Sequence, residues 1–529
     1  MRRWTVCLAV SAVCLVAASA ETTREDERVY QLRPSERAEM ALDHIGTTGI
    51  QARIYPGLVL KVEGLVEDSP ADGNFEIGEI LTTVNGVELN EGNPFVTLGD
   101  ALTQAEAGDG RLTFDVLSAE GENLRQEQVE IPVIGAYSET WPLNCPKSDK
   151  IVRDAAEFFS QPEWLEDRGM PGALTALFLL STGDDQYLPT VKSYFESFPD
   201  HVERIGDHTW NNGYNGIVAA EYYLRTGDES VLPILQYFCD DAERRQKFGV
   251  GWIHWGDGVR PQYVAGGLMN PASAQVLTTL LLAKECGLDV DEETLLGALR
   301  FFYRFADKGS VPYGDHRGEG GLGSNGKDGM IAAAMHIAAG SSGDTTIYEK
   351  ARDHLALSMM DSYIALVRGH GDSGRGDAIW RSLVTHYMKD LRPGQYREAM
   401  DRLTWWHDLG RQPSGALEFA TLQWGIGDTG SSGAGVGLSY TAPRQTMRIT
   451  GAPRTEFSVE HIVSCLPLIE PWIRKMSRCS SKAPTSSPLT ATWNTTDIRM
   501  NRPGRWTSSS RACTCRISPA NDAKSKIHP

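Results

Sequence analysis

The sequence predicts a multidomain α+β protein, in which a small β-rich module precedes a larger domain of repeated helix hairpins. Two observations support this prediction. Short β-type runs and an Asn-Gly turn fill residues 44–134, whereas apolar residues follow a helical period from about residue 150. The helical part also repeats, because residues 172–189 align without gaps to residues 216–233 at an offset of 44 residues.

The first 20 residues have the pattern of a cleavable secretory signal. Arg2 and Arg3 precede an apolar run from Trp4 to Ala17, and small residues follow at 18–20. The apolar run is too short to span a bilayer, which needs about 20 helical residues. Residues 21–43 are a charged lead-in. We therefore expect a periplasmic or secreted protein with no membrane span after cleavage.

Charged residues are distributed unevenly along the chain. The net charge is -18, yet residues 461–529 carry 11 Lys and Arg against 3 Asp and Glu. The acidic remainder argues against nucleic acid as a partner, because like charges repel. Residues 461–529 are rich in Ser and Thr and lack a helical period, so they are either a disordered basic tail or a frameshifted reading. We assign no function to this irregular tail.

The strands, turns and helix expected in residues 44–134 follow a characteristic order. A strand near residues 57–62 leads to a turn at Ser69-Pro70-Ala71, and Ile77–Ile80 and Val84-Asn85-Gly86 follow. A helix is expected at residues 98–107 and a half-buried strand at 111–117. These motifs resemble a bacterial-type PDZ domain.

The PDZ resemblance implies a peptide-binding site. It places Tyr55, Gly57, Leu58 and Val59 in the loop that captures a C-terminal carboxylate, and it implies that the following strand offers an edge to a peptide. Pro56 removes one backbone donor from this loop. The alternative is a PDZ-like fold that serves only as an intramolecular packing module.

The helical part, residues 150–455, is expected to be an α/α toroid, with an open α-solenoid as the alternative. The first helix of each hairpin is apolar nearly all round, as in residues 173–180, 274–283 and 330–339. Such a helix should be buried on all sides, which favours the inner ring of a toroid.

Four loops that enter the inner helices carry His together with Asp, and in a toroid they would converge at one end. These loops are residues 206–212, 252–258, 313–317 and 369–377. Paired carboxylates could act as acid and base on a glycosidic bond, and aromatic rings could stack on sugars. The candidates for catalysis are Asp207, His208, Asp257 and Asp315, and those for stacking are Trp210, Trp252, Trp255 and Tyr313.

Two other interpretations of these loops remain open. His208, His254, Asp257 and His316 carry side chains that can bind a divalent metal. Equally, Asp before a helix is often an N-cap, and Gly with Asp is ordinary turn chemistry. The sequence identifies no cofactor.

The whole arrangement resembles exported planctomycete-type proteins of unknown function, which carry a PDZ module followed by a helical toroid. The resemblance rests on Cys145-Pro146-Lys147-Ser148, on residues 266–271 and on Ser324-Asn325-Gly326-Lys327, besides the PDZ motifs. This resemblance implies no established activity. We therefore expect a binding protein that docks a peptide C-terminus or a protein partner through its PDZ module, while its toroid holds a ligand. A glycan-active enzyme, a hydrolase or lyase, is the alternative.

Overall fold

A computed structural model describes most of the chain between residues 40 and 460. The described residues are 40–42, 44–196, 198, 209–253, 268–306, 311–312, 314, 326–341, 346–361, 380, 383–418 and 429–460. The signal and the irregular tail lie outside this range, as does the lead-in except for residues 40–42.

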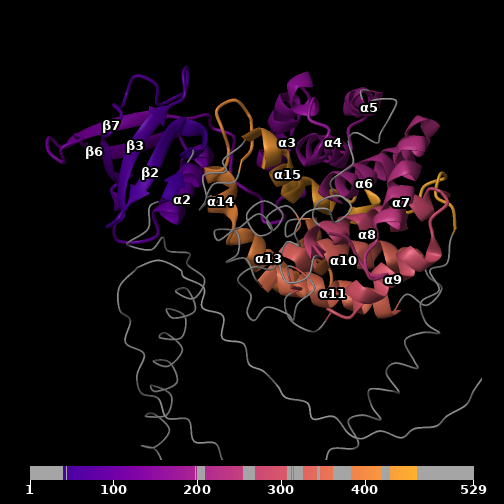
Figure 1. Ribbon diagram of the computed structural model, residues 1–529. Helices are drawn as coiled ribbons and strands as arrows, with labels where there is room; N and C mark the ends of the chain where they lie inside the picture. Colours follow the sequence, from indigo (N-terminus) through magenta and orange to yellow (C-terminus); the bar gives the residue numbers. More distant parts are fainter. Residues whose placement is uncertain are drawn as a thin grey trace, which may run out of the picture. The chain divides into compact units, whose positions relative to one another are not determined.

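The first part of the described chain is an antiparallel β-module (Figure 1). Its strands follow the order β1-β2-β3-β4-β6-β7, and β5 pairs with β4. The strands are β1 Met40–Leu42, β2 Ile50–Tyr55, β3 Val59–Leu65, β4 Ile80–Val84, β5 Val87–Glu88, β6 Arg111–Leu117 and β7 Arg125–Glu130.

One helix, α2 (Pro94–Ala107), covers the sheet of the β-module. Asn93 caps it, because its side chain accepts the backbone N–H of Phe95 at 3.1 Å, and Pro94 occupies the first turn, where its missing donor costs nothing. Phe95 and Leu98 are buried against the apolar face of the sheet. The other face of α2 is turned toward the helical region.

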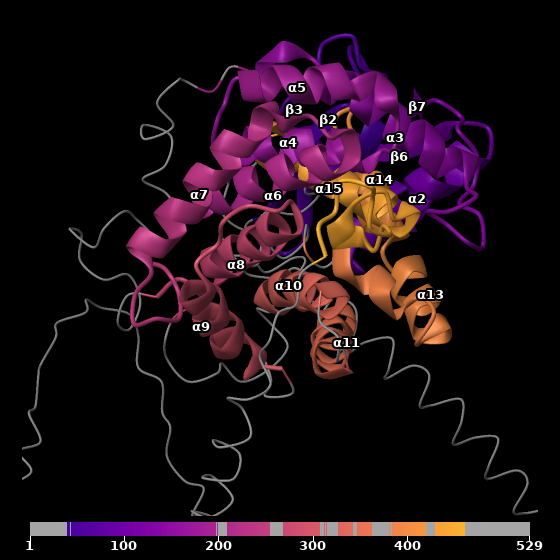
Figure 2. The same cartoon turned by 90° about the vertical axis from the view of Figure 1, so that its right-hand side faces the viewer.

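The helical region consists of helix hairpins, and Figure 2 shows α8 with α9 and α10 with α11 as neighbouring pairs. The helices are α3 Pro146–Phe159, α4 Met170–Ser181, α5 Leu188–Glu196, α6 Thr209–Thr226, α7 Leu232–Arg245, α8 Asn270–Glu285, α9 Glu292–Tyr303, α10 Gly326–Ser341, α11 Thr346–Asp361, α13 Pro393–Asp401, α14 Thr404–Leu409 and α15 Thr429–Thr441.

The repeat in the sequence corresponds to a repeated turn between the helices of a pair. Asp184 and Asp228 each accept the backbone N–H of the residue two positions later, at 3.0 Å. This Asx cap opens a short 3-10 turn, after which Leu-Pro begins α5 and α7. The predicted hairpins are confirmed, and α4, α8 and α10 are buried almost along their whole length.

The first helices of the pairs run parallel. Thr279 of α8 donates to the carbonyl of Gly213 in α6 at 2.8 Å, and further along both helices Cys286 lies 3.9 Å from the carbonyl of Ala220. The last helix, α15, lies beside the first of the set, α4, where the hydroxyls of Ser181 and Thr441 are 2.6 Å apart. We call α4, α6, α8, α10 and α15 the inner helices.

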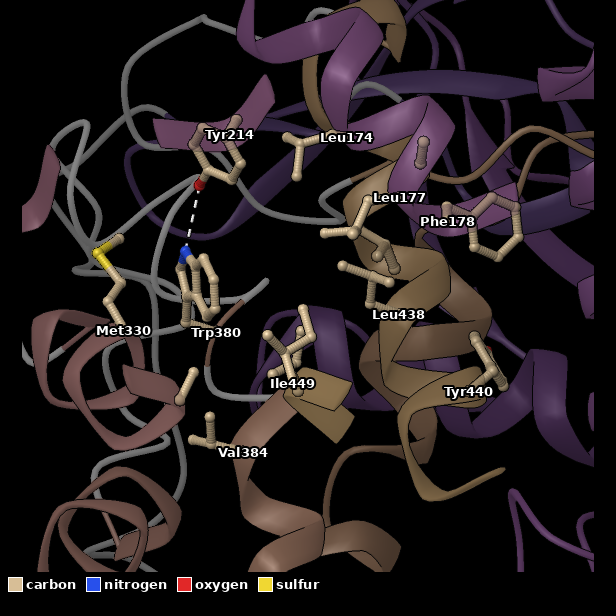
Figure 3. Packing of buried hydrophobic residues seen from close by; sticks show 14 of the residues in the cluster. Leu174, Leu177, Phe178, Tyr214, Met330, Trp380, Val384, Leu438, Tyr440 and Ile449 are labelled. Carbon is tan, nitrogen blue, oxygen red and sulfur yellow. Dashed lines mark hydrogen bonds between the residues drawn. The ribbon is translucent and has the colours of Figure 1, made fainter. Parts of the chain in front are cut away.

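Apolar side chains fill the space between the inner helices. Figure 3 shows Leu177 and Phe178 of α4 against Leu438 and Tyr440 of α15, with Ile449 close by. Cys145, Cys239 and Cys286 are buried free thiols. Within the described residues, no helix combines the length and apolarity needed to cross a membrane.

Candidate functional site

Most of the residues that the sequence nominates for chemistry lie outside the described part of the chain. Asp207, His208, Asp257 and Asp315 are outside the described residues, and so are Trp255 and Tyr313. The same holds for His254, His316 and the loop 369–377. The convergence of these residues therefore stays a prediction. The structure describes the helices that follow them in the sequence.

These loops precede helices that begin at one end of the inner set. Residues 207–208 come directly before Thr209, the first residue of α6, and residue 315 comes before α10, which begins at Gly326. The side chain of Asn270, at the start of α8, donates to the carbonyls of Pro312 and Gly314 at 2.8 and 2.9 Å. We call this end of the inner helices the entry end.

Polar side chains are buried near the entry end of these helices. Gln275 of α8 is fully buried, and its amide nitrogen lies 3.6 Å from the sulfur of Met330. Its Oε1 has no hydrogen-bond partner among the described residues. Such an atom costs free energy unless a ligand or water satisfies it, so it marks a place where a polar group can bind.

Two aromatic side chains lie beside this amide. The Nε1 of Trp380 donates to the hydroxyl of Tyr214 at 3.1 Å, and both rings are fully buried (Figure 3). Burial raises the pKa of Tyr214 beyond its ordinary value, so the hydroxyl stays protonated at neutral pH. The entry end thus combines an amide, a neutral phenol and an indole.

Two tryptophans that were predicted to stack on a ligand differ in how deeply they are buried. Trp252 has no exposed surface, and its Nε1 donates to the carbonyl of Ala242 at 2.8 Å. It is a core residue, so its assignment to ligand stacking is wrong, because the indole fills the space between α7 and α8 with its donor satisfied. Trp210, in the first turn of α6, is half-buried and packs against the core.

The opposite end of the inner helices is closed by the segment Gln445–Val459, which we call the seal. Both oxygens of the buried Glu221 carboxylate accept backbone N–H groups, from Arg448 and Ile449, each at 2.8 Å. The Nε of Arg448 lies 2.6 Å from Oε1 of Glu285. Burial raises the pKa of Glu221 to about 7 even though these hydrogen bonds oppose the shift.

In the β-module, the nominated peptide-binding residues form a tight hairpin turn. Tyr55 pairs with Val59 across it, while Gly57 and Leu58 adopt positive φ angles of 88° and 59°. The strand that follows, β3, pairs with β2 on one side and with β4 on the other. The expectation of an open edge after this turn is therefore wrong, because strand pairing depends on partners distant in sequence.

A second turn in the β-module lies closer to α2. The 3-10 turn Gly46–Thr48 precedes β2, and a Cβ placed on Gly46 would lie 2.5 Å from Leu102 of α2. The end of α14 contacts both this turn and α2, and we call the region where the three meet the module cleft. The same Cβ would lie 2.9 Å from the backbone oxygen of Asp408.

Four buried charges join the β-module to the helical region, and we call them the junction network. They are Glu106 of α2, Lys147 of α3, and Asp408 and Arg411 at the end of α14. Lys147 lies 2.9 Å from Glu106 and 2.7 Å from Asp408, with no exposed side-chain surface. Arg411 lies 2.7 Å from Glu106 and 3.3 Å from Asp408.

Hydroxyl groups complete the junction network. The hydroxyls of Thr103 and Tyr137 donate to Asp408 at 2.6 and 2.7 Å. Burial opposes ionisation of Asp408, but the Lys147 ammonium and the Arg411 guanidinium hold its pKa below the ordinary value. Since the network contains two cations and two anions, it is electrically neutral and satisfied within the chain.

The sequence analysis missed the junction network. One signal was Lys147, which belongs to the motif that carried the family resemblance. A second was Glu106, an acidic residue near the end of the helix that is now α2.

A pocket of about 320 Å³ lies beside the network, lined by Thr47, Lys150, Asp154, Arg411 and their neighbours. Across the described ranges, no three His, Cys, Asp or Glu residues are grouped to hold a metal ion.

Comparison with known families gives one match. The model of a family described as a domain of unknown function, DUF6288, matches residues 148–451. The chain belongs to the DUF6288 family. The DUF6288 region runs from the first turn of α3 through α15 to the middle of the seal, so the inner helices and α14 all belong to it. No curated protein and no solved structure matches the chain.

Proposed function

We propose that the protein is an exported binding protein, in which a toroid of helix hairpins holds a ligand and a PDZ-type module docks a peptide or protein partner. The observation that carries the first part is the polarity of the inner helices. Their entry end buries an amide oxygen that has no partner among the described residues, whereas their other end is closed by the seal. We therefore expect a ligand to approach from the entry end.

The arrangement of the inner helices supports a closed ring. The last inner helix lies beside the first, which is the contact that closes a toroid and that an open solenoid lacks. Parallel helices also direct their amino-terminal dipole ends toward the entry end, where the partial positive charge attracts oxygen-rich ligands. Polar ligands such as glycans carry many oxygen atoms that such donors bind.

Ligand binding is tested by screening the chain from residue 21 onward against an array of soluble oligosaccharides. We expect Gln275→Leu to weaken binding of any hit at least tenfold, because the buried amide loses its contact. Thr278→Val, on the same helix and equally buried, is the matched control and should bind normally. The proposal fails if no oligosaccharide binds, or if both variants bind like the parent chain.

Glycan cleavage is the second candidate function, favoured by the position of the nominated carboxylates before α6, α8 and α10. We expect Asp207→Asn, Asp257→Asn or Asp315→Asn to abolish the appearance of new reducing or unsaturated ends while leaving binding intact. If the parent chain binds a glycan for hours without releasing any product, the protein is a binding protein and these carboxylates are structural.

The order of turn, strand and helix in the β-module supports the PDZ assignment. The Gly46–Thr48 turn precedes β2 directly and packs against Leu102 of α2, which is the order and neighbourhood that a peptide-binding module of this type uses. In this arrangement the turn before β2, rather than the hairpin at Tyr55–Val59, is the place for a peptide end.

A further inference from the structure

The module cleft is already filled by the chain itself. Leu409, the last residue of α14, has no exposed surface, and the backbone oxygen of Asp408 approaches Gly46. A Cβ on Gly99, in the middle of α2, would lie 2.7 Å from the Cα of Trp405. Figure 1 shows α14 beside α2, between the β-module and the other helices.

The strand edge next to the cleft is closed as well. The exposed side of β2 would be the position for an added peptide strand, but β1 pairs there in antiparallel register, with Leu42 opposite Ala52 and Met40 opposite Ile54. The first strand of the β-module and the distant helix α14 therefore occupy the places that an external peptide would need.

The contacts of α14 specify one position on α2. Buried ion pairs contribute little net free energy compared with apolar packing, since desolvation offsets most of their attraction, but they fix one geometry. The junction network and the Thr103 hydroxyl thus determine where α14 sits, and residues 405–409 are buried there. A helix of six residues also has little stability of its own once it leaves this surface.

We propose that α14 is an intramolecular ligand of the β-module, which keeps the module cleft closed to peptides until α14 is displaced. The inference rests on the proposed peptide-binding role of the module and is independent of the ligand proposed for the toroid. A partner that opens the cleft must present the chemistry of α14, namely an apolar residue beside an acidic one.

The test uses the chain from residue 21 and a fluorescent peptide that copies residues 403–412. The intact chain should show no change in anisotropy, because its own α14 fills the cleft. Leu409→Ala removes a buried side chain from α14 but leaves α2 unchanged, so it should bind the peptide at least tenfold more tightly than the parent. Asp408→Asn serves as a second releasing variant if Leu409→Ala fails to fold.

A substitution on the receiving surface shows where the peptide binds. Adding Gly99→Ala to Leu409→Ala should abolish binding, because the new methyl group occupies the space of the Trp405 backbone. Gly394→Ala, at an exposed position with no atom within 4 Å of the added Cβ, is the control and should leave binding unchanged.

Each alternative result is informative. Equal peptide binding by the parent chain overturns the intramolecular closure but supports the module as a peptide-binding site. If residues 404–409 exchange amide hydrogens faster in the folded variants and no peptide binds, both the closure and the peptide-binding role fail. Unchanged exchange in both variants also contradicts the inference, because α14 then does not depend on the contacts described.

Discussion

At the residue scale, Glu221 is a carboxylate enclosed by protein and held by two backbone donors of the seal. Its pKa is raised to about 7 in the folded state, above the ordinary value of 4.5. A raised pKa means that its contribution to stability is fully present below pH 4.5 and is lost as the pH rises through 7.

We expect Glu221→Gln to flatten the dependence of stability on pH. The amide is neutral throughout, so the variant should lose the slope that ionisation of Glu221 gives between pH 4.5 and about 7, at most about 1.4 kcal/mol per pH unit. Thermal unfolding of both chains across this range checks the prediction. Parallel curves would show that Glu221 does not titrate in the folded protein.

Single residues also show where sequence reasoning ends. Trp252 and Trp210 carry the same side chain and were both predicted to stack on a ligand, yet one is fully buried and the other half-buried. The difference arises from Ser273 and Ala242, which satisfy the backbone and indole donors of Trp252 from other elements. Local sequence does not contain that information.

At the scale of elements, the junction network holds α2, α3 and α14 together by charges that belong to different parts of the sequence. Removing one member leaves an uncompensated buried charge, whereas removing an opposite pair restores neutrality. The two kinds of change should therefore differ in how far they lower the free energy of unfolding.

We expect Lys147→Met to lower the free energy of unfolding by about 3–5 kcal/mol, because Glu106 and Asp408 then share a single cation. Lys147→Met combined with Asp408→Asn should cost at least about 1 kcal/mol less than the sum of the single changes. Denaturant unfolding of the four chains measures this coupling.

The exposed pair Lys150 and Asp154, 2.9 Å apart on α3, provides the control for that cycle. Its coupling should stay below about 1 kcal/mol, because solvent screens both charges. Equal coupling in the two pairs would show that burial of the junction network has no energetic effect.

Elements with their own periodicity were predictable, and their pairing was not. The inner helices follow from unbroken apolar runs, and the turns between hairpins follow from Asp with Leu-Pro, since both signals lie within 20 residues. The edges of the sheet and the closure of the module cleft depend on contacts such as Thr103 with Asp408, which are separated by 305 positions. No local pattern specifies such a contact.

At the scale of the whole molecule, the connection between the β-module and the helices is fixed rather than loose. The backbone N–H groups of Ile134 and Gly135 donate to the carbonyl of Glu106 at 3.1 and 2.9 Å. Farther along, the indole N–H of Trp141 donates to Asp401 at 3.1 Å. The connecting residues are therefore bonded to both parts.

We expect residues 40–460 to unfold in a single cooperative transition. The β-module loses the partners of its buried charges when the helices unfold, so neither part should persist alone. Calorimetry should give a calorimetric enthalpy close to the van't Hoff enthalpy. Two resolved transitions would show instead that the module is an independent folding unit.

The seal also has a consequence for the order in which the protein is made. Glu221 and Glu285 are synthesised more than 160 residues before Arg448, the residue that neutralises and caps them. Until that late segment leaves the ribosome, the inner helices carry two acidic side chains in an apolar interior without their partner. Contacts of such long range form slowly, so completion of the earliest helices waits for the last residues of the domain.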